Sequence, residues 1–183
     1  MYLNRELPWN VVVPSKQLHS EGLLLQEAII LQLLEDFSDH KATSEYGYFV
    51  APTSLERIGD GKVRQDSGDV LFPVVFNCIT FKPFREEILC GIVTNIVKRG
   101  VILSCGPIKK KVYLSATKMG DYHHFPGKNP VFQNDKDSKI EKYMLVRFKV
   151  LDTRWIETQR EFHILGSLEG DHLGPIYSCE SSF

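Results

Sequence analysis

The 183-residue sequence predicts an α+β fold, with an antiparallel sheet and one packed helix in the first half and a five-stranded barrel of the OB type in the second. Three observations predict this class. One long segment, around residue 30, has the apolar content of a helix. Most of the remainder alternates apolar and polar residues, as strands do. A long polar connection separates the third and fourth strands of the second half, which is typical of a Greek-key OB barrel.

The first half is expected to begin with a strand over Tyr2–Val13, which Pro8 interrupts and Pro14 closes, because proline lacks the N–H that a strand ladder needs. Two further strands are expected over Tyr46–Thr53 and Asp69–Phe84. These strands would form the sheet on which the helix packs.

The predicted helix runs from about Leu23 to Phe37, with Ser20 as its candidate N-cap. Its polar residues fall around the whole circumference at ~100° per residue, so no polar stripe marks a solvent face. The surplus apolar surface needs a second cover, either a deeper core or a partner subunit, and the small size of the domain favours the partner. The candidate partner-binding residues are Leu24, Leu25, Ile29 and Leu31.

The segment LERIGDGKVRQDSGDV, between the second and third strands, is too polar to bury and too rich in glycine for a helix. It is either a plain connecting loop or a projection that inserts into another protein. It is not a phosphate-binding loop, because the third glycine, the Lys-Ser/Thr pair and the following helix are missing. The candidate contact residues of the projection are Ile58, Gly59, Gly61, Lys62 and Arg64.

The second half is expected to contain five antiparallel strands with a long polar excursion, residues 122–139, before the fourth. The predicted strands are Glu87–Lys98, Gly100–Cys105, Lys111–Leu114, Met144–Asp152 and Phe162–Glu169. This assignment places the pair Lys98-Arg99 at the turn between the first two strands. It places the run Lys109–Lys111 at the turn before the third.

The charges are distributed unevenly. Residues 1–80 carry 6 Lys and Arg against 11 Asp and Glu, whereas residues 81–183 carry 16 against 12. The second half is therefore expected to face an anionic partner, although lysines at strand ends also serve as solvated residues that discourage edge pairing. On an OB barrel, such residues follow the phosphates of single-stranded nucleic acid and aromatic residues stack on bases. The candidate RNA-binding residues are Lys98, Arg99, Lys109, Lys110, Lys111, Tyr113, Arg147 and Lys149.

Other function classes have little support in the sequence. The six histidines lack metal-site spacing, no GxSxG occurs, and acid pairs such as Glu86-Glu87 fit surface charge, so we expect no enzyme, metal or cofactor. No apolar run reaches the ~18 residues of a membrane span, and the start of the sequence lacks a signal-peptide pattern. Four scattered cysteines without a CxxC favour reduced thiols in an intracellular protein.

Residues 72–115, FPVVFNCITFKPFREEILCGIVTNIVKRGVILSCGPIKKKVYLS, resemble the seventh subunit of eukaryotic RNA polymerase II and its archaeal counterpart. The glycine-rich IGDGKV (58–63) is similar to that family's tip loop. The segments LPWNVVVP, KATSEYGYFV, YLSATKMGDY and SLEGDHLGP resemble most the plant members of RNA polymerases IV and V. The matching residues include Pro73, Phe81, Pro83, Phe84, Gly100, Gly106, Pro107 and the segment GSLEGDHLG (166–174).

The resemblance implies a truncated RNP-like domain over residues 1–80 and an S1-type OB domain over residues 81–183. It implies a non-catalytic stalk subunit of a nuclear DNA-dependent RNA polymerase. The first domain would dock its tip loop on the polymerase core, which includes the largest subunit, and pair with the fourth-largest subunit. The second would contact nascent single-stranded RNA. The likeness to the polymerase IV and V members implies a role in small-RNA-directed DNA methylation and gene silencing.

The sequence departs from the family at one RNA-binding position. The S1 pattern GxFV places an aromatic residue on the second barrel strand, where this chain reads Gly100-Val101-Ile102-Leu103. Tyr113 and the lysines are therefore expected to carry more of the RNA binding, which makes it weaker and more dependent on salt. The alternative is a free-standing OB-fold RNA-binding module outside a polymerase, which would be a stable monomer without a partner.

Overall fold

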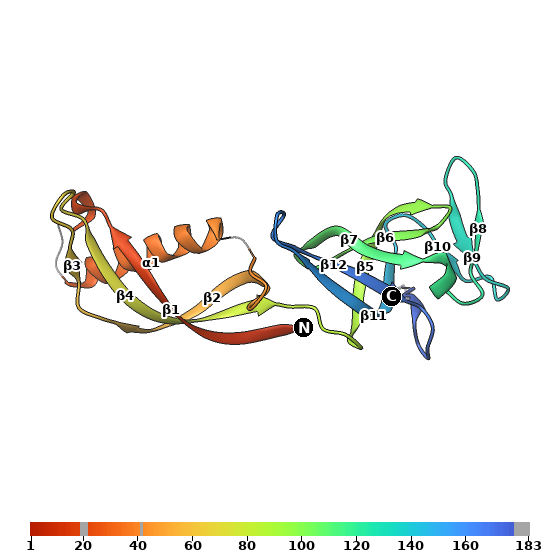
Figure 1. Cartoon of the computed structure of the whole chain (residues 1–183), viewed down its shortest axis with the longest axis horizontal. Coiled ribbons are helices and arrows are strands. Elements are labelled where there is room, and N and C mark those ends of the chain that lie inside the picture. Colours follow the sequence, from red (N-terminus) through yellow and green to blue (C-terminus); the bar gives the residue numbers. More distant parts are fainter. Residues whose placement is uncertain (19–21, 41, 178–183) are drawn as a thin grey trace, which may run out of the picture. The chain divides into compact units, whose positions relative to one another are not determined.

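The computed structural model describes residues 1–18, 22–40 and 42–177, and the side chains of all of these except residues 22–24. Within this part, the chain divides into two compact units, Tyr2–Lys82 and a unit that begins at Pro83 (Figure 1). The first is a sheet with one helix and the second contains a closed barrel. The predicted α+β class, a helix-covered sheet followed by an OB barrel, is confirmed.

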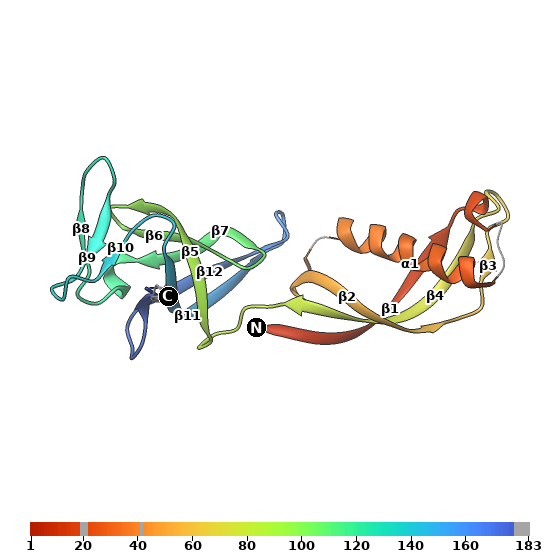
Figure 2. The ribbon, with the colours of Figure 1, turned by 180° about the vertical axis from the view of Figure 1, so that it is seen from behind.

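The N-terminal unit is an antiparallel sheet of order β1-β4-β2, in which the short β3 also pairs with β4. The helix α1 lies against one face of this sheet in both views of the chain (Figures 1 and 2). The elements are β1 (Tyr2–Val13), the 3-10 turn η1 (Ser15–Gln17), α1 (Gly22–Asp39), β2 (Tyr48–Ile58), β3 (Lys62–Val63) and β4 (Val70–Phe81). The predicted cap Ser20 lies outside the described residues.

Two details of this sheet differ from expectation. β1 runs unbroken through Pro8, which lies opposite Val75, because β1 is an edge strand and an edge tolerates a missing N–H. β2 continues to Ile58 instead of ending at Thr53, with register irregularities against β4. Part of the expected loop is therefore strand, and the short β3 returns the chain to β4.

The core of this unit follows from strand alternation. Every second residue of β1 and β4 points to α1, so Val11 and Phe76 are fully buried. The helix contributes Ile29, Leu33 and Phe37 at a spacing of four, which places them on one side. Fully burying a side chain of this size contributes about 1.5–3 kcal/mol, so this face of α1 is anchored to the sheet.

The C-terminal unit is a barrel of order β12-β7-β6-β5-β11, which closes because β11 also pairs with β12. The pairings are antiparallel except that between β7 and β12. The short β13 extends the sheet beside β11. The barrel elements are β5 (Ile88–Val97), β6 (Gly100–Cys105), β7 (Ile108–Ser115), η2 (Ala116–Lys118), β11 (Leu145–Ile156), β12 (Glu161–Ser167) and β13 (Gly174–Pro175).

The polar excursion over residues 122–139 is not irregular. It forms a three-stranded antiparallel sheet of β8 (His123–Phe125), β9 (Val131–Gln133) and β10 (Lys139–Ile140). Phe132 and Ile140 are buried in it. The Asn134 side-chain oxygen accepts from the backbone N–H of Lys136 at 3.1 Å and of Ser138 at 2.8 Å, which closes the turn between β9 and β10. Two- and three-residue strands are too short to show an alternating pattern, so the sequence does not predict them.

Candidate functional site

The turn between β5 and β6 carries Lys98 and Arg99, as predicted. Tyr113 of β7 packs against it, since its hydroxyl donates to the Arg99 carbonyl at 2.7 Å. Gly100 allows this contact. It has φ of 157°, and a Cβ there would lie 2.1 Å from the Leu114 carbonyl oxygen. The turn and the aromatic ring are therefore held together as one structure.

A hollow of about 480 Å³ lies at this turn, and we call it the turn hollow. Among the residues that the structure describes, Lys98 and Arg99 have no ion-pair partner, so their charges are available to an anion. The turn hollow is lined by Lys98, Arg99, Tyr113, Ser115, Ala116 and Thr117.

The run Lys109–Lys111 was expected at the turn before the third strand, and this is wrong. The residues lie inside β7, because Gly106 and Pro107 form the turn and Cys105 pairs directly with Ile108. Gly106 has φ of 54°, which suits a tight hairpin. The lysine run forms a bulge of β7 opposite Ser104, in which Lys110 has φ of 56° and donates its N–H to the Ser104 hydroxyl at 2.9 Å.

This register places the lysine run and the pair Lys98-Arg99 at opposite ends of β6 and β7. Gly100 pairs with Ser115 at one end and Cys105 with Ile108 at the other. Five residues at about 3.4 Å each separate the ends by roughly 17 Å. The predicted RNA-binding residues therefore do not form one continuous rail.

Arg147 and Lys149 lie at the same end of the barrel as the lysine run, and the five cations form one group. Arg147 and Lys149 lie opposite Cys90 and Ile88, at the start of β5 and far from its turn to β6. Carboxylates neutralise two of the five cations in this group. Lys111 pairs with Glu161 at 3.0 Å, and Lys149 pairs with Glu86. Lys109, Lys110 and Arg147 have no ion pair within the described residues, so this end keeps part of its positive charge. The turn end is the stronger candidate site because both of its cations are unpaired in the same residues and lie beside the Tyr113 ring.

The tip of the N-terminal unit, residues 58–63, packs its backbone closely against side chains of β4. Gly59 donates its N–H to the Pro73 carbonyl at 2.7 Å. A Cβ at Gly59 would lie 2.8 Å from the Pro73 ring, and a Cβ at Gly61 would lie 2.6 Å from the Phe72 ring. Neither glycine has a positive φ. Close approach, and not an unusual backbone conformation, explains both residues.

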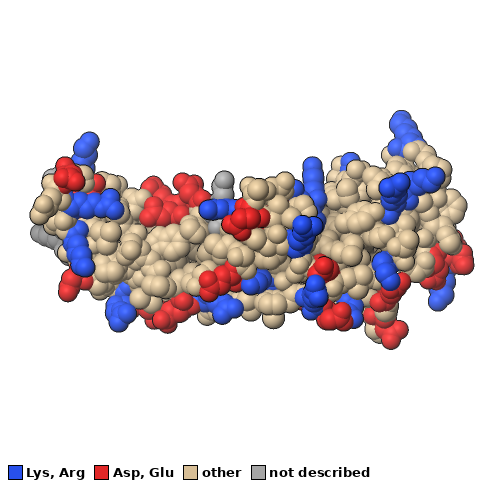
Figure 3. Space-filling view, viewed as in Figure 1, with Lys and Arg blue, Asp and Glu red and all other residues tan. Residues whose placement is uncertain are grey.

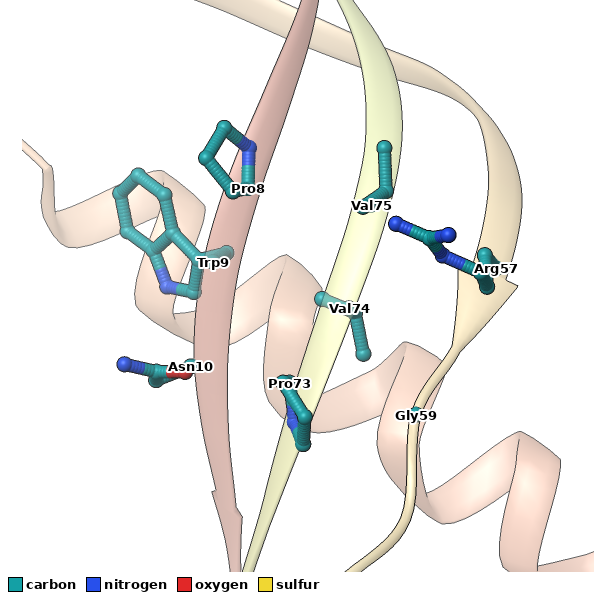
Figure 4. A pocket seen from close by; sticks show the side chains of 8 residues that line it. All are labelled: Pro8, Trp9, Asn10, Arg57, Gly59, Pro73, Val74 and Val75. Atoms are coloured by element: carbon teal, nitrogen blue, oxygen red, sulfur yellow. The ribbon is translucent and has the colours of Figure 1, made fainter.

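Gly59 borders a hollow of about 810 Å³, which we call the sheet hollow (Figure 4). Pro8 and Asn10 of β1 and Pro73 and Val75 of β4 line it, and α1 passes behind these strands. By alternation these four side chains point away from the helix. Arg57 adds a cation at the rim. Ile58 ends β2, Lys62 lies in β3, and the Arg64 N–H donates to the Asp69 carbonyl at 2.8 Å.

The predicted partner-binding face of α1 needs a correction. Ile29 is 1% exposed and belongs to the core of its own unit, because its position on the helix points at the sheet. Leu25 is half-buried against the same core, and the side chain of Leu24 lies outside the described part. Leu31, by contrast, is 63% exposed. It stays a candidate for a partner contact.

The structure adds Leu34 to this face. Leu34 is 44% exposed and lies three residues from Leu31, on the same side of the helix. It borders a groove of about 210 Å³ between α1 and the edge strand β2, together with Ile30 and Leu55. We call this the helix groove. The i, i+3 spacing was present in the sequence, but only the position of the sheet shows which leucines it leaves uncovered.

Within the described ranges, no group of three or more His, Cys, Asp or Glu side chains could hold a metal ion. In the same residues, no helix is both long and apolar enough to cross a bilayer.

The fold shows the class of protein. The chain is an OB-barrel protein with a second unit, a sheet covered by one helix. No family model matches the chain. It is 51% identical over 176 residues to DNA-directed RNA polymerase V subunit 7 of Arabidopsis thaliana, covering 96% of this chain and 98% of that protein. It is 47% identical over 175 residues to the polymerase IV subunit 7 of the same plant, covering 96% and 99%.

A third relative is the DNA-directed RNA polymerase II subunit RPB7 of Glycine max, 33% identical over 170 residues, which covers 91% of this chain and 94% of that protein. The chain belongs to the family of DNA-directed RNA polymerase subunit 7. It is more similar to the polymerase IV and V members than to this polymerase II member, which confirms the resemblance seen in the sequence.

Proposed function

We propose that the protein is a non-catalytic stalk subunit of a nuclear RNA polymerase of the IV or V type. It pairs with the fourth-largest subunit and contacts nascent single-stranded RNA. The observation that carries the proposal is the 51% and 47% identity to polymerase V and IV subunit 7 over nearly the whole chain. A role in small-RNA-directed DNA methylation and gene silencing follows from those two polymerases.

Three surfaces support separate contacts with the polymerase core, the fourth-largest subunit and RNA. The sheet hollow, with Gly59 at its border, suits docking on the polymerase core, including its largest subunit, because it is a concave surface on the sheet face that α1 does not cover. The helix groove and Leu31 suit the fourth-largest subunit, because exposed leucines gain free energy when a partner covers them. The turn hollow suits RNA, because it combines unpaired cations with an aromatic ring.

Purification of the endogenous protein tests the assignment directly. The fourth-largest subunit and the largest subunit of polymerase IV or V should be recovered with it and identified by mass spectrometry. Recovery of the protein without any polymerase subunit would contradict the proposal and favour a free-standing RNA-binding module.

The RNA contact is tested by charge reversal at the two ends of the barrel. Replacing Lys98 and Arg99 by Glu should weaken binding to all single-stranded RNAs alike, because phosphate contacts do not distinguish bases. The log–log salt slope should fall by about 0.7 per lost contact, or ~1.4 for the pair. The matched control, Lys111→Glu with Lys149→Glu, should change both quantities much less, since Glu161 and Glu86 already pair with these two lysines.

Replacing Tyr113 by Ala should lower the affinity without changing the salt slope, because stacking releases no counterions. Affinities at several salt concentrations, with circular dichroism to confirm folding, measure all three variants. If the folded Lys98→Glu, Arg99→Glu protein bound RNA as the unmodified protein does, the transcript path would lie elsewhere.

A further inference from the structure

Tyr143 stands out among the large apolar and aromatic side chains of the described residues, because it is the most exposed, at 74%. Its position is nevertheless fixed. Its N–H donates to the Val93 carbonyl at 2.8 Å, and the Val93 N–H donates to the Met144 carbonyl at 2.9 Å. Tyr143 has φ of 72°, a left-handed conformation that is rare for a bulky residue. The barrel thus holds an aromatic ring out into solvent at a conformational cost.

The ring borders a hollow of about 630 Å³, which we call the Tyr143 hollow. One wall comes from β5 and the other from the connection between β8 and β9. Its polar lining consists of Asn95, Lys128, Asn129, Glu141 and Lys142. Within the described chain neither lysine has an ion pair, and the Lys142 ammonium lies 5.0 Å from the centre of the Tyr143 ring.

This combination fits a nucleotide. The face of an aromatic ring stacks on any base, amide side chains can bond to base edges, and two cations against one carboxylate favour a phosphate. A small apolar ligand would not need the lysines, and a divalent cation would be repelled by them. The hollow therefore favours single-stranded nucleic acid.

The Tyr143 hollow lies next to the turn hollow. Asn95 and Ile96 line the first and Lys98 the second, with only Val97 between them along the chain. Three residues of strand span about 10 Å, so one short single strand could contact both. Figure 3 shows one face of the C-terminal unit. Basic side chains without acidic neighbours lie along its upper side, and basic and acidic side chains alternate along its lower side.

We propose that the Tyr143 hollow is a nucleobase-binding subsite for single-stranded RNA, in which a base stacks on Tyr143 and Lys128 and Lys142 contact the adjoining phosphates. This inference rests on the proposed RNA contact at the turn hollow. It assigns the main stacking surface to Tyr143 because Tyr113 is less free, being half-buried with its hydroxyl bonded to the Arg99 carbonyl.

The test uses the full chain and oligouridylates that carry 4-thiouridine as a photo-crosslinking probe. Tyr143→Ala should weaken binding by about 5- to 150-fold and leave the salt slope unchanged. Tyr143→Phe should bind as the unmodified protein does, because it keeps the ring. Lys128→Ala with Lys142→Ala should lower the slope by ~1.4. The matched control is Phe125→Ala, which removes another exposed aromatic ring, 51% exposed, from β8 and should have no effect.

The outcomes separate this subsite from the function on which it rests. If the unmodified protein bound no single-stranded RNA, the proposed RNA contact itself would fail. If it bound RNA through Lys98 and Arg99, but Tyr143→Ala bound equally well and no crosslink mapped to Tyr143, the subsite alone would be overturned. The subsite would also be overturned if a bound protein partner covered Tyr143 and the affinity for RNA were the same with and without that partner. Crosslinking of the unmodified protein decides the question even if the alanine variant does not fold.

Discussion

At the scale of single residues, neighbouring positions on α1 have different roles, one in the core of the unit and one on its surface. Ile29 and Leu31 are two positions apart on α1, yet Ile29 is 1% exposed and Leu31 is 63% exposed. A helix turns by about 200° over two residues, so the two side chains point in nearly opposite directions. The first stabilises the N-terminal unit, and the second is available to another molecule.

This difference predicts unequal effects on stability. Ile29→Ala should lower the free energy of unfolding by about 2–5 kcal/mol, because it leaves a cavity between helix and sheet. Leu31→Ala should change it by no more than about 0.5 kcal/mol, as is usual for an exposed position. Urea unfolding of the isolated protein measures both. Equal losses would show that the helix packs differently.

A second residue-scale prediction concerns pH. Burial raises the pKa of the Cys105 thiol from 9.0 to about 11. Between these values the unfolded chain releases the thiol proton and the folded protein retains it, so the free energy of unfolding should fall as pH rises from about 9 to about 11. Below pH 9 the contribution is fully present.

Cys105→Ala is the control for this pH effect. It should give a flatter curve over the same range, because the titrating group is gone while the raised pKa of the buried Cys78 thiol remains in both proteins. Chemical denaturation at a series of pH values makes the comparison. Parallel curves for the two proteins would contradict the shift.

At the scale of elements, the tip of the N-terminal unit shows how a polar, glycine-rich segment can be ordered. β2 extends into it and β3 returns from it, leaving Gly59 and Gly61 pressed against β4. The segment is thus a tight projection of the sheet and not a long loop. Its geometry depends on two positions where a side chain does not fit.

Replacing Gly59 and Gly61 by Val should therefore distort the tip and abolish association with the polymerase core, while the barrel stays folded. A pull-down of core subunits, with circular dichroism of the same sample, measures this. Gly127→Val is the control, because a Cβ at Gly127 meets only the Asn129 carbonyl, at 3.9 Å. Unchanged core recovery with the double variant would show that the tip is only a connector.

At the scale of the whole molecule, the two units carry different surfaces. The acidic first half presents exposed leucines beside an open sheet edge. The basic second half presents a barrel end at which Lys98 and Arg99 have no ion pair among the described residues. An edge strand and an apolar groove are both liabilities for a protein in isolation. We therefore expect the isolated chain to depend on its assembly partner for stability.

Co-expression with a homologue of the fourth-largest polymerase subunit should raise the soluble yield and the melting temperature together. Covering the apolar surface at ~25 cal/mol per Å² should stabilise the pair by several kcal/mol. Leu31→Glu with Leu34→Glu should remove the gain, whereas Leu165→Glu, at an exposed apolar position on the barrel, should not. A stable monomer that gains nothing on mixing would rule out the heterodimer.

The local pattern of the sequence was sufficient for the class and for several elements. The strand Gly100–Cys105 was predicted with its observed bounds, and the Lys98-Arg99 turn lies where it was expected. Alternation over six or more residues, or a glycine after a basic pair, is encoded by neighbouring residues and needs no distant contact. The similarity to the subunit 7 family was also readable from the sequence.

Only the tertiary structure decided which residues share a surface. Strand order and barrel closure place Lys111 beside Glu161 and Lys149 beside Glu86, and leave Lys98 without an ion pair in the described residues. The position of the sheet decided that Ile29 is buried, and the bond to Val93 holds the Tyr143 ring in solvent. These outcomes depend on pairings between residues far apart in the chain, whereas periodicity reports only what adjacent residues prefer.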